Sequence, residues 1–305
     1  MLTIRFPYLP YFPYPLFFMS PFIHERTFRI RHYECDAYGH VNNANYVRYM
    51  QEAAFDASAA VGYDFKRYVE MNCLWLIRET DIEYLRPLKY GDSVRVKTWV
   101  DDFRRVRSRR MYELYSLSDG ELAARANTDW VFMDTKTNRP ATIPEEMIRA
   151  FMPDHDPKDA PPRQKFPVSP PPPPGIFKMY MKVPWRDVDT AGHVNNAMYL
   201  SYISDCGMAV AAHFGWTIQR MWEAGFGIIV RRHQIEYLRE AFMDDELEIA
   251  TYLSDLKRAT AIRHYTIRRV KDNEILTRVR TLYVWIDPKT GSVKRMPEEF
   301  LRDFE

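Results

Sequence analysis

Two stretches of the chain carry apolar side chains at helical spacing, and a glycine follows each of them. The first stretch covers 46–61 before Gly62, and the second covers 199–214 before Gly215. The apolar or small positions that share a face are Tyr46, Val47, Met50, Ala53, Ala54, Ala57 and Val61, and then Tyr199, Leu200, Ile203, Gly207, Val210 and Phe214. This spacing predicts two helices with glycine caps, and their small residues indicate close packing on a sheet.

Alternating apolar and polar positions predict strands on either side of the helices. The clearest stretches are 28–33, 94–100, 107–117, 122–133 and, in the second half, 247–253. Ser118-Asp-Gly120 is a turn sequence between two of them. One long helix with a run of antiparallel strands is an α+β pattern. A sheet that curls around the helix would bury its apolar stripe.

The second half of the chain repeats the first at an offset of 153 residues. Asp36-Ala-Tyr-Gly-His-Val-Asn-Asn-Ala-Asn-Tyr46 returns as Asp189-Thr-Ala-Gly-His-Val-Asn-Asn-Ala-Met-Tyr199, with eight of eleven positions identical. Ile82-Glu-Tyr-Leu-Arg86 and Pro144-Glu-Glu146 return at the same offset. A repeat of this length is a whole domain. We therefore expect two homologous domains that dock through their sheets like the subunits of a homodimer.

The expected boundaries are an aromatic and proline-rich arm over 1–26, a first domain over 27–151, a linker over 152–176 and a second domain over 177–305. Prolines interrupt the arm, which excludes a signal peptide and a membrane-spanning helix. It is either a loose arm or the result of a translation start placed before Met19. Pro170–Pro174 favours a semi-rigid tether on the outside of the molecule over an SH3-type ligand.

Composition limits the partners and the compartment. The formal net charge is +2, so nucleic acid is not an expected partner. The three cysteines suggest neither a disulfide framework nor a metal cluster, and reduced thiols fit a cytoplasmic protein. The chain shows no metal-ligand spacing, P-loop or Gly-x-Ser-x-Gly elbow, so we expect no metal and no cofactor.

The repeated polar string stands directly before each helix, where its residues can perform chemistry. Its glycine, Gly39 or Gly192, allows a tight turn or the close approach of a ligand, so we expect both glycines to contact substrate. Unpaired amides and the helix dipole at the helix start can hold a carbonyl oxygen that gains negative charge. Asp36 or Asp189 could then attack the carbonyl carbon or activate a water. Loop capping is the alternative, and retention of the string in both copies favours catalysis.

This string, with Ile-Glu-Tyr-Leu-Arg and the later Val-Phe or Val-Trp strand, resembles the hotdog-fold thioesterases, most closely the 4-hydroxybenzoyl-CoA thioesterase-like group. The resemblance implies two tandem hotdog domains with active sites at their interface, and hydrolysis of an acyl-CoA or acyl-ACP thioester in fatty acid metabolism. A non-catalytic acyl-thioester binder is the alternative. Larger homo-oligomers are also common in such families. The implied roles are catalysis for Asp36 and Asp189, and carbonyl polarisation for Asn43 and Asn196. Tyr46 and Tyr199 close the motif, where they could contact substrate, although packing is the favoured role.

A second resemblance is to plant-type acyl-ACP thioesterases, which are also tandem hotdogs. They place Asp, Asn and His at alternate positions, and this chain has Asp189 and His193 but Ala191 between them, with Tyr38 in the first copy. The family's glutamate corresponds to Glu240, and its cysteine is absent. A cysteine-dependent mechanism is therefore not expected. The extra acid in the second copy predicts that this copy is the more active.

Two further sets of residues have open roles. His40 and His193 could orient water or the substrate carbonyl, or could be structural. An arginine-rich segment could contact the phosphates of coenzyme A, although a solvated strand face is the favoured explanation. Its members are Arg104, Arg105, Arg107, Arg109 and Arg110.

Overall fold

A computed structural model describes residues 21–154, 156 and 162–304. The predicted N-terminal arm lies outside the described residues as far as residue 20. The elements of the first repeat are β1 (His24–Arg29), η1 (His32–Glu34), α1 (Asn43–Ala60), α2 (Phe65–Glu70), β2 (Cys73–Tyr84), β3 (Ser93–Phe103), β4 (Arg107–Ser116), β5 (Leu122–Asp134), β6 (Arg139–Pro140) and α3 (Glu145–Phe151).

The second repeat has nearly the same order of elements. They are β7 (Phe177–Lys182), η3 (Trp185–Asp187), α4 (Met198–His213), α5 (Ile218–Glu223), β8 (Gly227–Tyr237), β9 (Glu246–Ser254), β10 (Thr260–Arg269), β11 (Ile275–Ile286) and α6 (Glu298–Phe304). The predicted long helices and the strands that follow them are confirmed.

The first strand differs from its predicted position at 28–33. It begins at His24 and pairs with β3 as far as Arg29, so part of the expected arm belongs to the sheet. Residues 32–34 form a single 3-10 turn instead of strand. The Glu34 carboxylate closes this turn by accepting a hydrogen bond of 2.7 Å from the backbone N–H of Arg31. Such a local side-chain bond competes with the sheet ladder, and the alternation of apolar residues does not reveal it.

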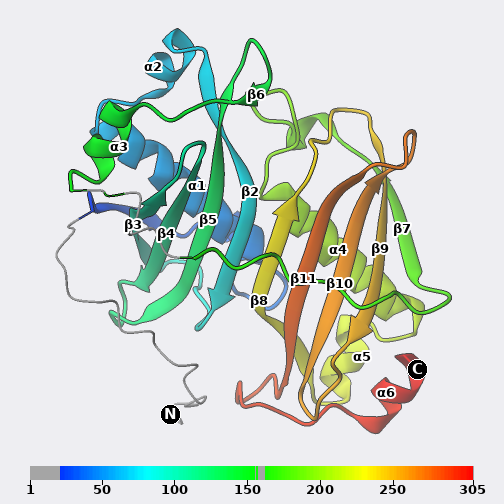
Figure 1. Cartoon of the computed structure of the whole chain (residues 1–305). Helices are drawn as coiled ribbons and strands as arrows, with labels where there is room; N and C mark the ends of the chain where they lie inside the picture. The colour runs from blue at the N-terminus through cyan, green and yellow to red at the C-terminus, as the bar shows by residue number, and fades with distance from the viewer. Residues whose placement is uncertain (1–20, 155, 157–161, 305) are drawn as a thin grey trace.

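One antiparallel sheet runs through both repeats in the order β1-β3-β4-β5-β2-β8-β11-β10-β9-β7. Figure 1 shows β2 and β8 side by side at its centre. Asp81 lies opposite Gln234, its own counterpart at the 153-residue offset, so the seam has local two-fold symmetry. The predicted docking through the sheets, as in a homodimer, is confirmed.

Matched ion pairs cross this seam. Arg78 contacts Glu236 at 3.3 Å, and its counterpart Arg231 contacts Glu83 at 2.9 Å. Each pair joins one repeat to the other, and the two pairs are related by the same symmetry as the strands. The domain interface therefore uses one set of contacts twice, as an isologous interface does.

The helices α1 and α4 lie on the same side of the sheet (Figure 1), and each buries the stripe that the sequence predicts. Met50, Ala53 and Ala57 of α1 are at most 1% exposed. Burying a large apolar side chain such as Met50 contributes about 1.5–3 kcal/mol. Gly62 and Gly215 both have positive φ, which confirms the predicted caps. These two buried helices give the molecule its hotdog architecture.

The linker crosses the other face of the sheet, as the green trace in Figure 1 shows. Arg163 pairs with Asp102 and Asp129, two carboxylates that are at most 2% exposed. Farther along, the Ser169 hydroxyl lies 3.0 Å from Nδ1 of His264 in the second repeat. The predicted course on the outside is confirmed, and the linker is anchored at both repeats.

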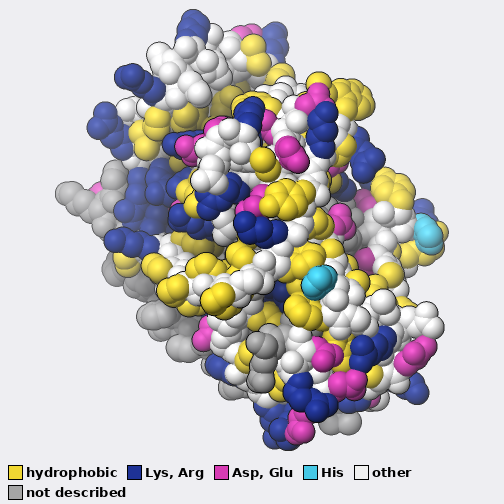
Figure 2. All heavy atoms as spheres, turned by 90° about the vertical axis from the view of Figure 1, so that its right-hand side faces the viewer, with side chains coloured by type: hydrophobic (Ala, Val, Ile, Leu, Met, Phe, Trp, Pro, Cys, Tyr) yellow, Lys and Arg dark blue, Asp and Glu magenta, His cyan; other side chains and the backbone are white. Residues whose placement is uncertain are grey.

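The surface of the second repeat mixes charges of both signs. Figure 2 shows Lys and Arg interspersed with Asp and Glu, and apolar groups between them. All three cysteines are free thiols. In the described part of the chain, no group of three or more His, Cys, Asp or Glu side chains could hold a metal ion. Nor is any helix among these residues long and apolar enough for a bilayer crossing.

A buried histidine beside the seam makes stability depend on pH. His233 of β8 is 1% exposed, and burial lowers its pKa from 6.5 to about 3. Between pH 6.5 and about pH 3, His233 therefore binds a proton in the unfolded chain but not in the folded one. The stability that neutral His233 contributes is fully present above pH 6.5 and is lost as the pH falls, by at most about 1.4 kcal/mol per pH unit for one proton.

We expect His233→Gln to flatten this dependence, because glutamine keeps a polar partner for the Thr281 hydroxyl, now 2.8 Å from Nδ1, and does not titrate. Urea unfolding between pH 7 and pH 5 measures the slope in both proteins. Equal slopes would show that another group is responsible.

Candidate active site

The second copy of the repeated string forms a tight loop in front of α4. The backbone N–H of Gly192 donates to the carbonyl of Asp189 at 3.0 Å, and the N–H of Asp189 donates to the carbonyl of His193 at 3.0 Å. Gly192 has φ +82, which favours glycine. The loop thus brings a carboxylate and an imidazole to the start of the helix.

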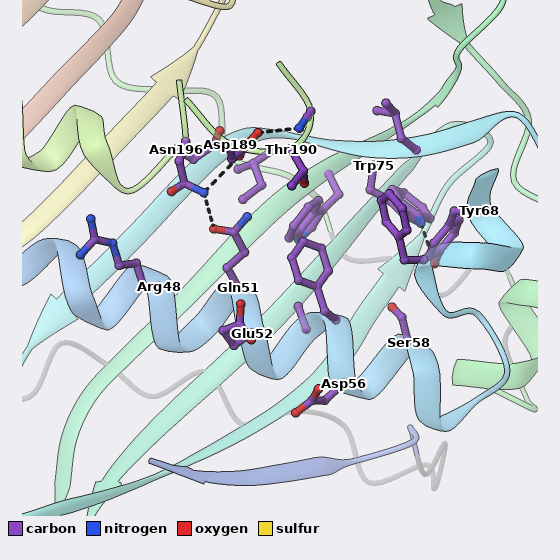
Figure 3. A pocket seen from close by; sticks show the side chains of 18 of the residues that line it. Arg48, Gln51, Glu52, Asp56, Ser58, Tyr68, Trp75, Asp189, Thr190 and Asn196 are labelled. Atoms are coloured by element: carbon purple, nitrogen blue, oxygen red, sulfur yellow. Dashed lines mark hydrogen bonds between the residues drawn. The ribbon is translucent and has the colours of Figure 1, made fainter. Parts of the chain in front are cut away.

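A cavity of about 1500 Å³ opens beside this loop. Its walls come from both repeats: α1 and β2 of the first, and the Asp189 loop of the second. Figure 3 shows α1 along one side, with Asp189, Thr190 and Asn196 near one end and Tyr68 and Trp75 near the other. The second copy of the motif thus lies at a cavity between the two repeats, where the resemblance implies an active site.

The Asp189 carboxylate is held on both oxygens. Oδ1 accepts a bond of 2.9 Å from the N–H of Ala191, and Oδ2 accepts one of 3.2 Å from Nδ2 of Asn195. The same Asn195 amide donates to Oε1 of Gln51 on α1 at 3.1 Å. A residue of the first repeat therefore helps to orient the loop of the second, and Figure 3 marks this link. Sequence reasoning missed both Asn195 and Gln51.

Asn196 lies where the oxyanion site is expected. It lines the cavity, and no described residue accepts a hydrogen bond from its backbone N–H. Its carbonyl accepts a bond of 3.2 Å from the hydroxyl of Tyr237, which fixes the peptide. The preceding Asn195 accepts from the N–H of Ala197, the residue directly before α4, at 3.0 Å. The positive end of α4 thus faces the cavity.

His193 and Asn196 also line a second cavity of about 430 Å³. Leu76 and Ile77 of β2 are common to both cavities, and Glu240 lines only the second. The Glu240 carbonyl accepts a bond of 3.2 Å from Nη1 of Arg269. The structure therefore brings Glu240 near His193 but not to the larger cavity. A ligand that passes His193 has room on both sides of it.

The first copy of the string has different surroundings. Asp36 is exposed, its Oδ1 accepts from the N–H groups of Tyr38 and His40, and neither Asp36 nor His40 lines the two cavities. The ring of Tyr38 packs edge-on against Trp222, with centroids 5.9 Å apart. The same ring lies 3.5 Å from the place that a Cβ would occupy if Gly227, the first residue of β8, carried a side chain.

The corresponding place in the second copy is open. The counterparts of Tyr38 and Gly227 are Ala191 and Leu74, and both of these line the large cavity. Gln51 likewise has Ser204 as its counterpart, whose hydroxyl donates to the Leu200 carbonyl within α4 at 2.8 Å. The two copies of the motif are thus similar in sequence and unequal in surroundings.

The remaining predicted residues have structural contacts. Tyr46 and Tyr199 are each 2% exposed, and their hydroxyls accept from the N–H groups of Leu88 and Ala241 at 3.2 Å. These contacts fit packing, although Tyr199 also lines the smaller cavity. Gly39, like Gly192, has positive φ in its turn. Asn43 accepts from the Tyr84 hydroxyl through its carbonyl at 3.3 Å.

The arginine-rich segment is divided between the two faces of the sheet. Arg107 and Arg109 contact Asp129 at 2.9 and 3.9 Å, and Arg104 contacts Asp102 at 3.7 Å. Arg110 points the other way and lines the large cavity. The favoured prediction of a strand face is thus correct for the paired arginines and wrong for the buried Arg110. Alternation along a strand, read residue by residue, could have indicated this.

Comparison with known proteins agrees with this architecture. The chain matches the thioesterase-like superfamily twice, over residues 30–151 and 183–304. It is 28% identical over 190 residues to the chloroplastic acyl-[acyl-carrier-protein] hydrolase FATB2 of Cuphea viscosissima, covering 59% of this chain and 46% of that protein. The chloroplastic palmitoyl-acyl carrier protein thioesterase of Arabidopsis thaliana is 25% identical over 286 residues, covering 88% of this chain and 65% of the relative.

Among solved structures, one described as an oleoyl thioesterase from Lactobacillus plantarum has the same fold, with a TM-score of 0.73. It is 18% identical, and the match covers 92% of this chain and 98% of that one. The chain spans about half the length of the first curated relatives that it matches. Because the two matches together cover well over half of the chain, it belongs to the thioesterase-like superfamily.

Proposed function

We propose that this protein hydrolyses an acyl thioester at a single site, formed by the Asp189 loop of the second repeat and α1 of the first. The observation that carries the proposal is the Asp189 carboxylate at a large cavity, next to a helix start whose Asn196 N–H has no described partner. A carboxylate beside a preorganised oxyanion site is the arrangement that acyl transfer to water requires.

In the proposed reaction, the thioester carbonyl oxygen accepts a hydrogen bond from the Asn196 N–H. The positive end of α4 stabilises the negative charge that develops on this oxygen. In one route, Asp189 takes a proton from a water molecule, and the oxygen of that water attacks the carbonyl carbon. In the other route, the Asp189 carboxylate attacks the carbonyl carbon itself, and water then hydrolyses the resulting anhydride. The C–S bond breaks with its electron pair on sulfur, and a proton restores the thiol. His193 at the junction of the two cavities is suitably placed to orient the water or the leaving group.

The carrier of the acyl group is proposed from the relatives. The two curated relatives reported above are named as an acyl-[acyl-carrier-protein] hydrolase and a palmitoyl-acyl carrier protein thioesterase, which favours acyl-ACP over acyl-CoA as the substrate. We place the reaction in the cytoplasm, in line with the free thiols. A non-catalytic acyl-thioester binder would use the same cavity. The Asp189 carboxylate supports an enzyme, since a binder of a neutral thioester gains nothing from a charge there.

A panel of acyl-ACP and acyl-CoA thioesters with a free-thiol readout tests the proposal. We expect turnover of at least one acyl-ACP, and slower turnover of the same acyl group on coenzyme A. Tight binding of these thioesters without release of thiol would identify a binder.

Gln51 gives a narrower test of the shared site. We expect Gln51→Ala to lower kcat about tenfold, because loss of one partner of a part-buried amide costs roughly 1–3 kcal/mol. Asn195 then holds Asp189 less firmly, so kcat falls while KM changes little. The matched control is Ser204→Ala, the same position in α4, which should leave kcat unchanged. Equal effects of the two variants would count against a role for Gln51 in orienting the loop.

A further inference from the structure

The end of the cavity away from Asp189 contains a buried cation. Arg110 of β4 lines the cavity and is only 6% exposed. Its position in the sheet is opposite Val100 on β3 and Thr128 on β5. Tyr68, which Figure 3 shows at the far end from Asp189, is one of the two hydroxyl groups that act electrostatically on it.

This cation has no anionic partner among the residues that the structure describes. Nη1 of Arg110 is buried and makes no hydrogen bond. The guanidinium lies over the ring of Phe151, whose centroid is 5.2 Å from Cζ. Asp102 and Asp129 lie on the other face of the sheet, where Arg163 pairs with both. Burial without a partner lowers the pKa of Arg110.

Between Asp189 and Arg110 the cavity has a mainly apolar wall. It includes Ala54, Phe55, Leu74, Trp75 and Ile77. Along α1 the distance from Gln51 to Ser58 is about 10 Å by the rise of a helix, and both residues line the cavity. An extended acyl chain of medium length can therefore lie along α1, with its thioester near Asp189 and its far end near Arg110.

The chemistry of that far end decides which chain fits. A chain that ends in a methyl group would leave the guanidinium desolvated and unpaired, which is unfavourable. A carboxylate would form a charge-assisted, two-pronged pair with it, since the planar guanidinium matches carboxylate geometry. Ser108, which is 5% exposed and also lines the cavity, adds a hydroxyl at the same end.

We propose that the substrate is an ω-carboxyacyl thioester, whose distal carboxylate is bound by Arg110 at the inner end of the cavity. This inference rests on the proposed function and narrows its substrate class. Arg110 is a specificity-determining residue in this proposal and takes no part in breaking the thioester bond.

The test compares dodecanoyl and 11-carboxyundecanoyl thioesters, each presented on coenzyme A and on an acyl carrier protein. We expect kcat/KM to be at least about tenfold higher for the carboxyl-terminated chain, because a hydrogen-bonded pair of charges stabilises the bound substrate by enough for such a difference. Arg110→Met should abolish the preference and raise activity toward dodecanoyl thioester. Arg263→Met, the same change at the equivalent position of the second repeat, should keep the preference.

Binding of the two matching non-hydrolysable thioethers to the wild-type protein, measured by calorimetry on both carriers, separates this inference from the proposed function. Preferential binding of the carboxyl-terminated thioether without turnover of either thioester would support the inference and refute hydrolysis. Turnover of both thioesters at equal kcat/KM would support hydrolysis and overturn the inference. Equal binding, or no binding on either carrier, would also overturn it.

Discussion

Asp189→Asn is expected to lower kcat for thioester hydrolysis at least about 100-fold, the usual contribution of a positioned general base. Asp36→Asn is expected to leave kcat within about twofold of wild type. The reason is the surroundings of the two carboxylates. Asp189 and Asn196 line the large cavity, and the Asn196 N–H has no hydrogen-bond partner among the described residues. Asp36 is exposed and lines neither cavity. Purified single variants, assayed for thiol release from the best acyl thioester, provide the measurement.

The pair of variants contains its own control, because both make the same change in the same motif. Melting temperatures near that of wild type would show that a loss of activity is not a loss of fold. Wild-type turnover by Asp189→Asn would refute the assignment. Equal losses in the two variants would retain aspartate catalysis and remove the asymmetry between the sites.

Ala191→Tyr is expected to lower kcat/KM about 100-fold, since even a small displacement of bound substrate can cost that much. The first loop shows that a tyrosine fits this turn, where Tyr38 packs against Trp222 and Gly227. In the second loop the ring would extend toward Leu74 and occupy part of the cavity that both residues line. Most of the loss should appear in KM, because the catalytic groups remain in place.

Ala191→Ser, a small change at the same position, should keep most of the activity. Tyr38→Ala should leave kcat/KM unchanged, because the first loop lacks a counterpart of the Gln51 contact. If Ala191→Tyr retains full activity, the acyl group does not enter past this residue. Gain of activity in Tyr38→Ala would show that the first motif is a blocked but intact site.

Much of the architecture could be predicted because it depends on repeated local patterns. The apolar stripe of 46–61 and the glycine after it define α1, and the constant offset of 153 residues implies a symmetric seam. The seam itself required no special motif, since two domains with similar edge strands can pair through them. The first strand was misplaced because the bond from Arg31 to Glu34 lies outside the apolar pattern.

The inequality of the two sites could not be predicted in the same way. The motif is nearly identical in both copies, and the differences that matter lie at positions that look neutral, such as Tyr38 and Ala191. Their meaning depends on which strand they face. Gln51 and Asn195 are 144 residues apart, so their contact follows only from the docking of the repeats. Arg110 differs from Arg107 and Arg109 because successive side chains of a strand point to opposite faces of the sheet.

Calorimetric titration of the whole chain with a non-hydrolysable acyl thioether tests the central claim most directly. The thioether cannot turn over, so the number of bound molecules per chain reports the number of complete sites. A single site per chain is expected, and its affinity should fall in Ala191→Tyr and stay the same in Tyr38→Ala. Two equivalent sites per chain, or one site that responds to Tyr38→Ala and not to Ala191→Tyr, would contradict the claim.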